Sequence, residues 1–210
     1  PHDLVTISSR CARIDFRRID DAEVEARLVT EGVTPDAAAA AARSAGGNLD
    51  RARVLAADPD LAARREAFAA VPHQLDGTGS TVMRLVDDLL GRIEAAAGPQ
   101  AARQAAEVNE LEERIARFGE RGSGKKMLEE RHKRELRRHR TDELIAGLTV
   151  IAGAYRDELV AGSIDHPDTA AQAVSRVHEA IEAFEHNPNE SLLLQALLWS
   201  LPVLTSARPR

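Results

Sequence analysis

The residues of this chain best suited to chemistry are the basic side chains between positions 131 and 140, which outnumber acidic ones six to one. The basic residues are Arg131, Lys133, Arg134, Arg137, Arg138 and Arg140, and the acidic residue is Glu135. Cations at this density can bind the phosphate backbone of a nucleic acid, in a manner that depends on salt and not on base sequence. Arg134, Arg137 and Arg138 are therefore candidate DNA contacts.

The alternative interpretation of the same segment is a solvated helix face that binds nothing. Acidic neighbours can balance its charge. They are Glu129, Glu130, Asp142 and Glu143. No aromatic residue lies among the cations to stack on nucleic-acid bases. The sequence favours the solvated face, and a DNA contact is the second hypothesis.

No other set of residues has the spacing of a metal, cofactor or nucleophilic site. Cys11 is the only cysteine, and a lone cysteine is usually a small buried side chain. His132 and His139 share one helix face on the basic segment, which is typical of a surface pair. Residues 122–126, G-S-G-K-K, resemble the tail of a phosphate-binding loop but lack its first glycine, its hydroxyl residue and a preceding strand. We expect this chain to bind neither a metal nor a cofactor.

The composition of the 210 residues limits the classes of protein to which this chain can belong. A formal net charge of -6 excludes a nucleic-acid footprint over the whole molecule, so any DNA contact must be local. The sequence has no run of about 18 apolar residues, which a membrane helix needs, and it shows no signal-peptide pattern. A single cysteine cannot close an intramolecular disulfide. We expect a cytoplasmic protein that makes no membrane contact.

The elements that must position these residues are almost all helices, because aromatic residues make up only 3% and alanine, leucine, arginine and glutamate dominate. Helix-start signals at Asp20, Thr34, Asn48 and Pro59 predict a compact unit of short helices over residues 17–71. Two short strands are expected in residues 1–16. The fold class is therefore all-α with a short β remnant at the N-terminus.

A second helical unit is expected after a linker. Residues 72–79 hold two glycines and a proline without hydrophobic periodicity, which predicts a domain boundary. Residues 80–201 predict a bundle of about five helices, beginning at Ser80, with a break at Gly98-Pro99. A long helix from residue 125 to about 162 should pack through its second half and expose its first half.

Residues 6–11, T-I-S-S-R-C, resemble the T-I-x-S-R-C segment of bacterial DNA polymerase III clamp-loader subunits, which are AAA+ proteins. Further stretches resemble the δ′ (delta prime) subunits of actinobacterial type. They are residues 47–58, 136–160 and 187–201. The resemblance covers nearly the whole chain. It implies that residues 1–16 end an AAA+ core, 17–71 form its helical lid and 80–210 form an oligomerising collar domain. A nucleotide-binding domain is expected before residue 1.

The resemblance implies a role for Arg10, flanked by the motif residues Ser9 and Cys11. In the family, this arginine reaches the γ-phosphate of ATP held by a neighbouring subunit. A guanidinium suits that role, because it is always charged and offers a planar fork of donors to phosphate oxygens. The chain itself would not be an enzyme. It would be an accessory subunit that joins gamma/tau and delta subunits in a pentameric ring, which loads the sliding clamp onto primed DNA in replication.

One departure from the family pattern lies at the start of the third helix. ATP-hydrolysing relatives carry a nucleotide-sensing arginine where this sequence has Asp50, and Arg51 follows one place later. A carboxylate repels phosphate, so we expect Arg51 and Arg53 to make ordinary surface contacts. The rival interpretation is a free-standing helical adaptor or DNA-binding bundle. Such a protein would have no AAA+ nucleotide domain encoded upstream.

Overall fold

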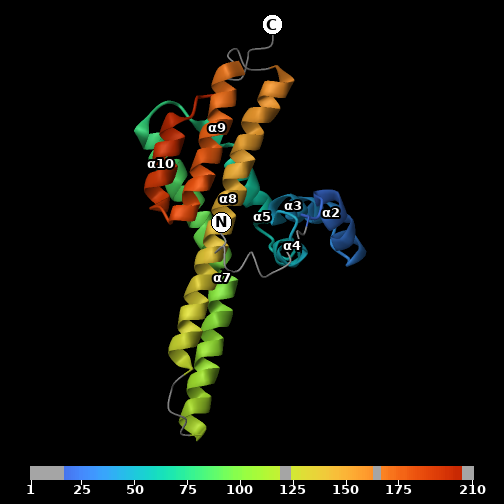
Figure 1. Ribbon diagram of the computed structural model, residues 1–210, viewed down its shortest axis with the longest axis vertical. Helices are drawn as coiled ribbons and strands as arrows, with labels where there is room; N and C mark the ends of the chain where they lie inside the picture. Colours follow the sequence, from blue (N-terminus) through green and yellow to red (C-terminus); the bar gives the residue numbers. More distant parts are fainter. Residues whose placement is uncertain (1–16, 119–123, 163–166, 205–210) are drawn as a thin grey trace, which may run out of the picture. The chain divides into compact units, whose positions relative to one another are not determined.

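The computed structural model describes residues 17–118, 124–162 and 167–204, all as helices and their connections (Figure 1). No strand occurs within these ranges, which confirms the all-α prediction. The two strands expected in residues 1–16 lie outside the described residues. So do Ser9, Arg10 and Cys11.

The chain divides into two compact units between Pro59 and Asp60. The sequence predicts this boundary later, at residues 72–79. The difference arises because Phe68 and Val71 are 2% and 0% exposed in the core of the second unit. The helix that carries Phe68 therefore packs with the bundle. Part of the expected linker is itself helical, since α6 spans Val71–Gln74.

Over residues 17–59, the described part of the first unit, there are three short helices, and each begins where the sequence signals predict. They are α2 (Asp21–Thr30), α3 (Pro35–Ala45) and α4 (Leu49–Ala56). Asn48 caps α4, because its side chain accepts a hydrogen bond from the backbone N–H of Arg51 at 3.0 Å. Gly46 ends α3 in the left-handed conformation, with φ at 63°. Alanine side chains on α3 allow close packing against α2 and α4.

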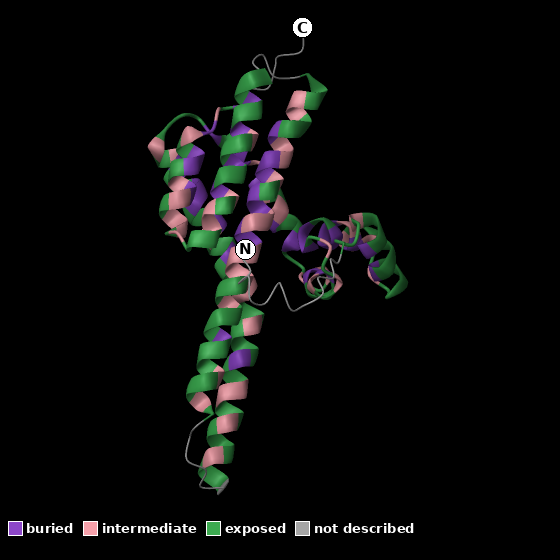
Figure 2. Cartoon of the chain, in the orientation of Figure 1, coloured by how far each residue is buried: buried purple, intermediate pink, exposed green. Residues whose placement is uncertain are grey.

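The second unit is a helical bundle with a long extension. Its main helices are α5 (Leu61–Ala69), α7 (Gly79–Phe118), α8 (Lys125–Ala161), α9 (Pro167–Ala183) and α10 (Glu190–Ser200), and a short 3-10 turn spans Phe184–His186. Figure 2 shows the buried residues gathered where these helices pack together. Tyr155 on α8 lies in this core and donates a hydrogen bond to the carbonyl oxygen of Pro202 at 2.6 Å.

Helix α7 is one continuous helix of 40 residues that includes Pro99. The predicted break at Gly98-Pro99 is therefore wrong, and residues 80–201 form four α-helices within the described ranges instead of about five. Side-chain pairs with α8 hold α7 on both sides of the proline. Arg140 Nη1 lies 2.6 Å from Glu94 Oε2 before it, and Gln104 Nε2 donates to Glu135 Oε2 at 2.9 Å after it.

The N-terminus of α7 is capped by a different residue from the one expected. The helix begins at Gly79, and Thr78 Oγ1 accepts a hydrogen bond from the backbone N–H of Thr81 at 3.3 Å. Asp76 supports this turn by accepting hydrogen bonds from Thr81 Oγ1 and Thr78 Oγ1, both at 2.7 Å. These bonds, the one from Thr81 first, lower the pKa of Asp76 to about 2.

Candidate functional site

The segment that carries the basic residues is half of a helical hairpin. Residues 98–118 of α7 and 125–140 of α8 lie side by side and extend beyond the bundle, and they are called the hairpin from here on (Figure 1). Most of its residues are exposed (Figure 2). The first half of α8 was expected to project into solvent, and it does so as the partner of α7.

The seam of the hairpin is polar. Gln104 on α7 and His132 on α8 are buried, at 4% and 6% exposure. His132 Nε2 donates to Glu107 Oε2 at 3.0 Å, and this bond is the largest of the contacts that lower the pKa of Glu107. Polar contacts at fixed positions specify one register between two helices, because any slip would leave buried groups unpaired.

The basic run of α8 divides into two sets, and the first set is neutralised by acidic side chains. Arg131 Nη2 lies 3.0 Å from Glu107 Oε2. Arg140 pairs with Glu94 and with Glu190 at the start of α10. Lys125, at the tip, pairs with Glu112 of α7. These cations join elements of the second unit and are already neutralised.

The second set faces outward and has no such partner. Lys133, Arg134, Arg137 and Arg138 are exposed and make no ion pair or hydrogen bond with any residue in the described ranges. Positions 133 and 137, and likewise 134 and 138, are four residues apart and so lie on adjacent turns. The set includes all three candidate DNA contacts: Arg134, Arg137 and Arg138. We call these four residues the basic row.

Two of the four acidic residues expected to balance this charge are paired with other cations. Glu143 is buried with Arg64 of α5, at 2.9 Å between Oε2 and Nε. Glu129 lies 3.7 Å from Lys125. Glu130 lines an open groove near the tip of the hairpin. Glu129 and Glu143 therefore neutralise other cations and not the basic row.

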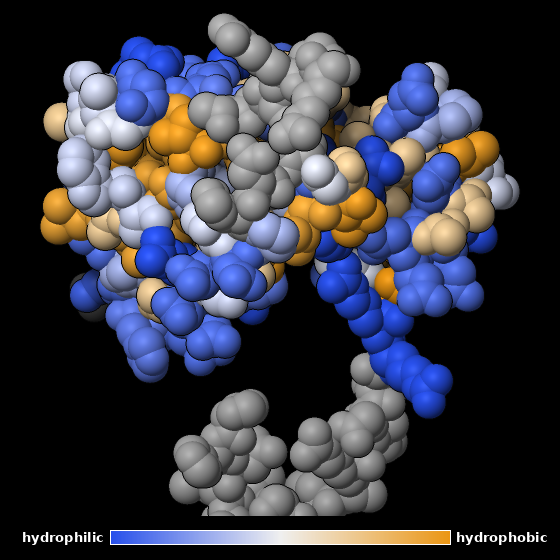
Figure 3. Space-filling model, turned by 90° about the horizontal axis from the view of Figure 1, so that it is seen from above, coloured by the Kyte–Doolittle hydropathy of each residue, from blue (hydrophilic) through white to orange (hydrophobic). Residues whose placement is uncertain are grey.

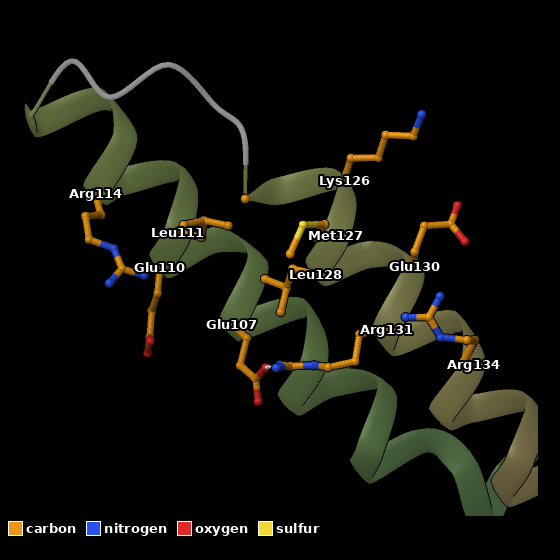
Figure 4. A pocket seen from close by; sticks show the side chains of 11 residues that line it. Glu107, Glu110, Leu111, Arg114, Lys126, Met127, Leu128, Glu130, Arg131 and Arg134 are labelled. Atoms are coloured by element: carbon orange, nitrogen blue, oxygen red, sulfur yellow. Dashed lines mark hydrogen bonds and ion pairs between the residues drawn. The ribbon is translucent and has the colours of Figure 1, made fainter. Parts of the chain in front are cut away.

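The groove near the tip lies between the two helices of the hairpin (Figure 4). Its floor includes Leu111 and Leu128, and Met127 at its side is 75% exposed. Arg134 lies at its edge and so connects the groove with the basic row. Charges of both signs line it.

The two histidines of α8 differ from the expected surface pair. His132 is buried against Glu107, and the Nε2 atom of His139 is buried without a hydrogen-bond partner. Across the described positions, no group of three or more His, Cys, Asp and Glu side chains could hold a metal ion. His132 instead belongs to the polar seam of the hairpin.

A second candidate surface lies on α10, which is apolar on two faces. Leu194, Leu197 and Leu198 point into the bundle core. On the opposite side, Leu192 and Trp199 are 63% and 64% exposed, with Ala196 exposed between them. Residues 192, 196 and 199 have the spacing of one helix face. Figure 3 shows hydrophobic surface on the side of the second unit where α10 lies.

In the first unit, Arg53 makes the surface contacts that the sequence predicts. It pairs with Glu31 at 2.7 Å and with Asp50 at 2.8 Å. The hydrogen bond from Arg53 is the largest cause that lowers the pKa of Glu31 to about 2, and Arg27 adds to it. Asp50 is thus occupied with an arginine of its own helix.

No protein-family model, curated protein or solved structure matches the chain. None of the helices in the described ranges is both long enough and apolar enough to cross a lipid bilayer. The function is therefore inferred from short sequence motifs and from the geometry of the hairpin and of α10. Sequence reasoning missed the role of Glu107, because its partners lie on another helix.

Proposed function

We propose that this chain is a δ′-type clamp-loader subunit of bacterial DNA polymerase III. In this role, residues 17–59 act as the AAA+ lid, and the second unit, which begins at Asp60 and includes α5 and α6, acts as the collar. The collar assembles with gamma/tau and delta subunits into the pentameric ring that loads the sliding clamp onto primed DNA. Arg10 acts in trans on the ATP of a neighbouring subunit. The sequence motif T-I-S-S-R-C is the basis for that role.

The structural observation that supports the assembly role is the outer face of α10. Leu192, Ala196 and Trp199 form an apolar row on a helix whose other face already fills the bundle core. Exposed apolar rows of this kind mark surfaces that other proteins cover. Large aromatic residues are enriched at such interfaces. A collar subunit needs this kind of surface, because it holds its neighbours through helix packing.

The test is assembly with the gamma/tau and delta subunits of the same source. The full chain should co-elute with them in size-exclusion chromatography, and Leu192→Glu should abolish this. Burial of a leucine side chain contributes about 1.5–3 kcal/mol, so the substitution should weaken binding at least about tenfold. Val160→Glu is the matched control, since Val160 is 81% exposed on α8 and outside the row.

If the Leu192→Glu variant co-elutes with the other subunits as fully as the Val160→Glu variant does, the outer face of α10 no longer supports the assembly role. Failure of the wild-type chain to join these subunits would favour the rival, a free-standing helical adaptor.

A further inference from the structure

We propose that the basic row on the hairpin, Lys133, Arg134, Arg137 and Arg138, is a binding site for the phosphate backbone of duplex DNA. This inference requires neither Arg10 nor the outer face of α10. It assigns the protein a DNA contact of its own, on a part of the second unit that lies away from α9 and α10 (Figure 1).

The first argument is the separation of charges along α8. Each of Lys125, Arg131 and Arg140 already has an acidic partner on α7 or α10, whereas the basic row has none in the described ranges. The formal net charge of the chain is -6, so this local excess does not simply reflect a basic protein. Four cations held on adjacent turns repel one another, and a polyanion relieves that repulsion.

The second argument is geometry. Residues 133–138 lie on one uninterrupted stretch of α8 in the hairpin, and the row extends over about 7.5 Å of helix axis. Duplex DNA rises about 3.4 Å per base pair, so this length faces about two base pairs, which carry four backbone phosphates. Helices α9 and α10 lie beside only the other half of α7 and α8 (Figure 1). The bundle of the second unit therefore leaves room for a rod-shaped ligand at the hairpin.

The third argument concerns the kind of ligand. Residues 125–140 contain no Phe, Tyr or Trp, so the stacking that proteins use to hold single strands is absent from this helix. The apolar residue between these cations, Leu136, is half-buried, so the exposed row is made of charged side chains, whereas the centre of a protein interface is depleted of charge. Three of the four are arginines, whose planar forks match phosphate oxygens. The row therefore suits a duplex backbone better than a single strand or an acidic protein.

The test is fluorescence anisotropy of the full chain with a labelled duplex of 20 base pairs, over 50–200 mM NaCl. Four phosphate contacts predict that wild-type affinity falls about 150-fold over this range. The triple variant Arg134→Gln, Arg137→Gln, Arg138→Gln keeps one contact, and its affinity should fall only about 3-fold over the same range. Its affinity at 50 mM should already be far below that of the wild type.

A matched control removes the same charge elsewhere. Arg17, Arg43 and Arg84 are exposed and lie outside the hairpin. Their joint change to Gln should give the same DNA affinity and the same salt dependence as the wild type. Circular dichroism of both variants checks that the helices are intact.

Several results would overturn the proposal. The first is an equal loss of duplex affinity in the two triple variants. The second is tighter binding of a single strand than of the duplex. The third is binding of polyglutamate by the row when duplex DNA is not bound. The last result would assign the row to an acidic protein. Assembly of the Arg134, Arg137, Arg138 variant with clamp-loader subunits is a separate readout, so the two proposals can fail independently.

Discussion

Glu143 on α8 accepts a hydrogen bond from Nε of Arg64 on α5 at 2.9 Å, and the two side chains are only 5% and 4% exposed. This buried pair joins α5 to the bundle close to the point where the hairpin begins. It explains why the boundary between the units lies before α5. The charges compensate one another out of contact with water, so neither can be removed alone without cost.

Replacement of Arg64 by Met should destabilise the second unit by about 3–5 kcal/mol, because the carboxylate of Glu143 would stay buried without its cation. The double variant Arg64→Met, Glu143→Leu should recover most of this loss. Urea denaturation of the full chain, followed by circular dichroism, measures both values. A single variant as stable as the wild type would contradict a buried, compensated pair.

Substitution of Gly147 by alanine should destabilise the protein by about 1–3 kcal/mol through overpacking. A Cβ atom at this position would lie 2.4 Å from the ring of Phe68, whereas at Gly153 on the same helix it would meet nothing within 4 Å. Gly153→Ala is therefore the control, and it should stabilise α8 by about 0.5–1 kcal/mol. Thermal unfolding of the two variants compares them directly. Equal effects would mean that α5 does not approach α8 as closely as described.

Tyr155 should resist ionisation in the folded protein. Burial raises the pKa of its hydroxyl above the ordinary value of about 10. Stability from this group is complete below pH 10 and is lost as the pH rises further, because only the unfolded chain ionises there. Tyr155 is the only tyrosine, so absorbance near 295 nm reports on it alone. At pH 11 the native protein should show little tyrosinate signal and the urea-unfolded protein a large one. Similar titration curves in both states would show that the hydroxyl is accessible.

Arg10 is the residue on which the proposed role in trans depends. In the assembled loader, Arg10→Ala should lower ATP hydrolysis at the neighbouring site by about 10³-fold or more, which is typical for the loss of an arginine finger. Arg10→Lys should not restore it, because a lysine lacks the planar fork. Complex formation should be unchanged in both variants. Unaltered ATP turnover and clamp loading by Arg10→Ala would reject the role.

Short-range signals in the sequence predicted the starts and ends of most helices. Asn48 caps α4 through its side chain, and Gly46 and Gly162 end α3 and α8 in the left-handed conformation. These features depend on neighbouring residues only, so a local pattern is sufficient to predict them.

Features that depend on contacts between distant segments were not predicted. Pro99 stays inside α7 because α8 pairs with that helix on both sides of it. Residues 72–79 have the composition of a linker, but glycine and threonine also form helix caps. In the structure they form the cap that starts α7. The division of the basic run into paired and outward cations requires the register between α7 and α8, which no local pattern contains. The exposure of this half of α8 was predicted from its sequence, whereas the identity of the cations left without an acidic partner in the described ranges was not.

Helices α7 and α8 pass without interruption from the bundle into the hairpin, over 40 and 37 residues. Each is a rod of about 55–60 Å. A rod of this kind transmits a push at one end as rotation at the other. A ligand held on the hairpin would therefore exert torque on the helices around Tyr155 and Leu148, and the hairpin would act as a lever arm for the bundle.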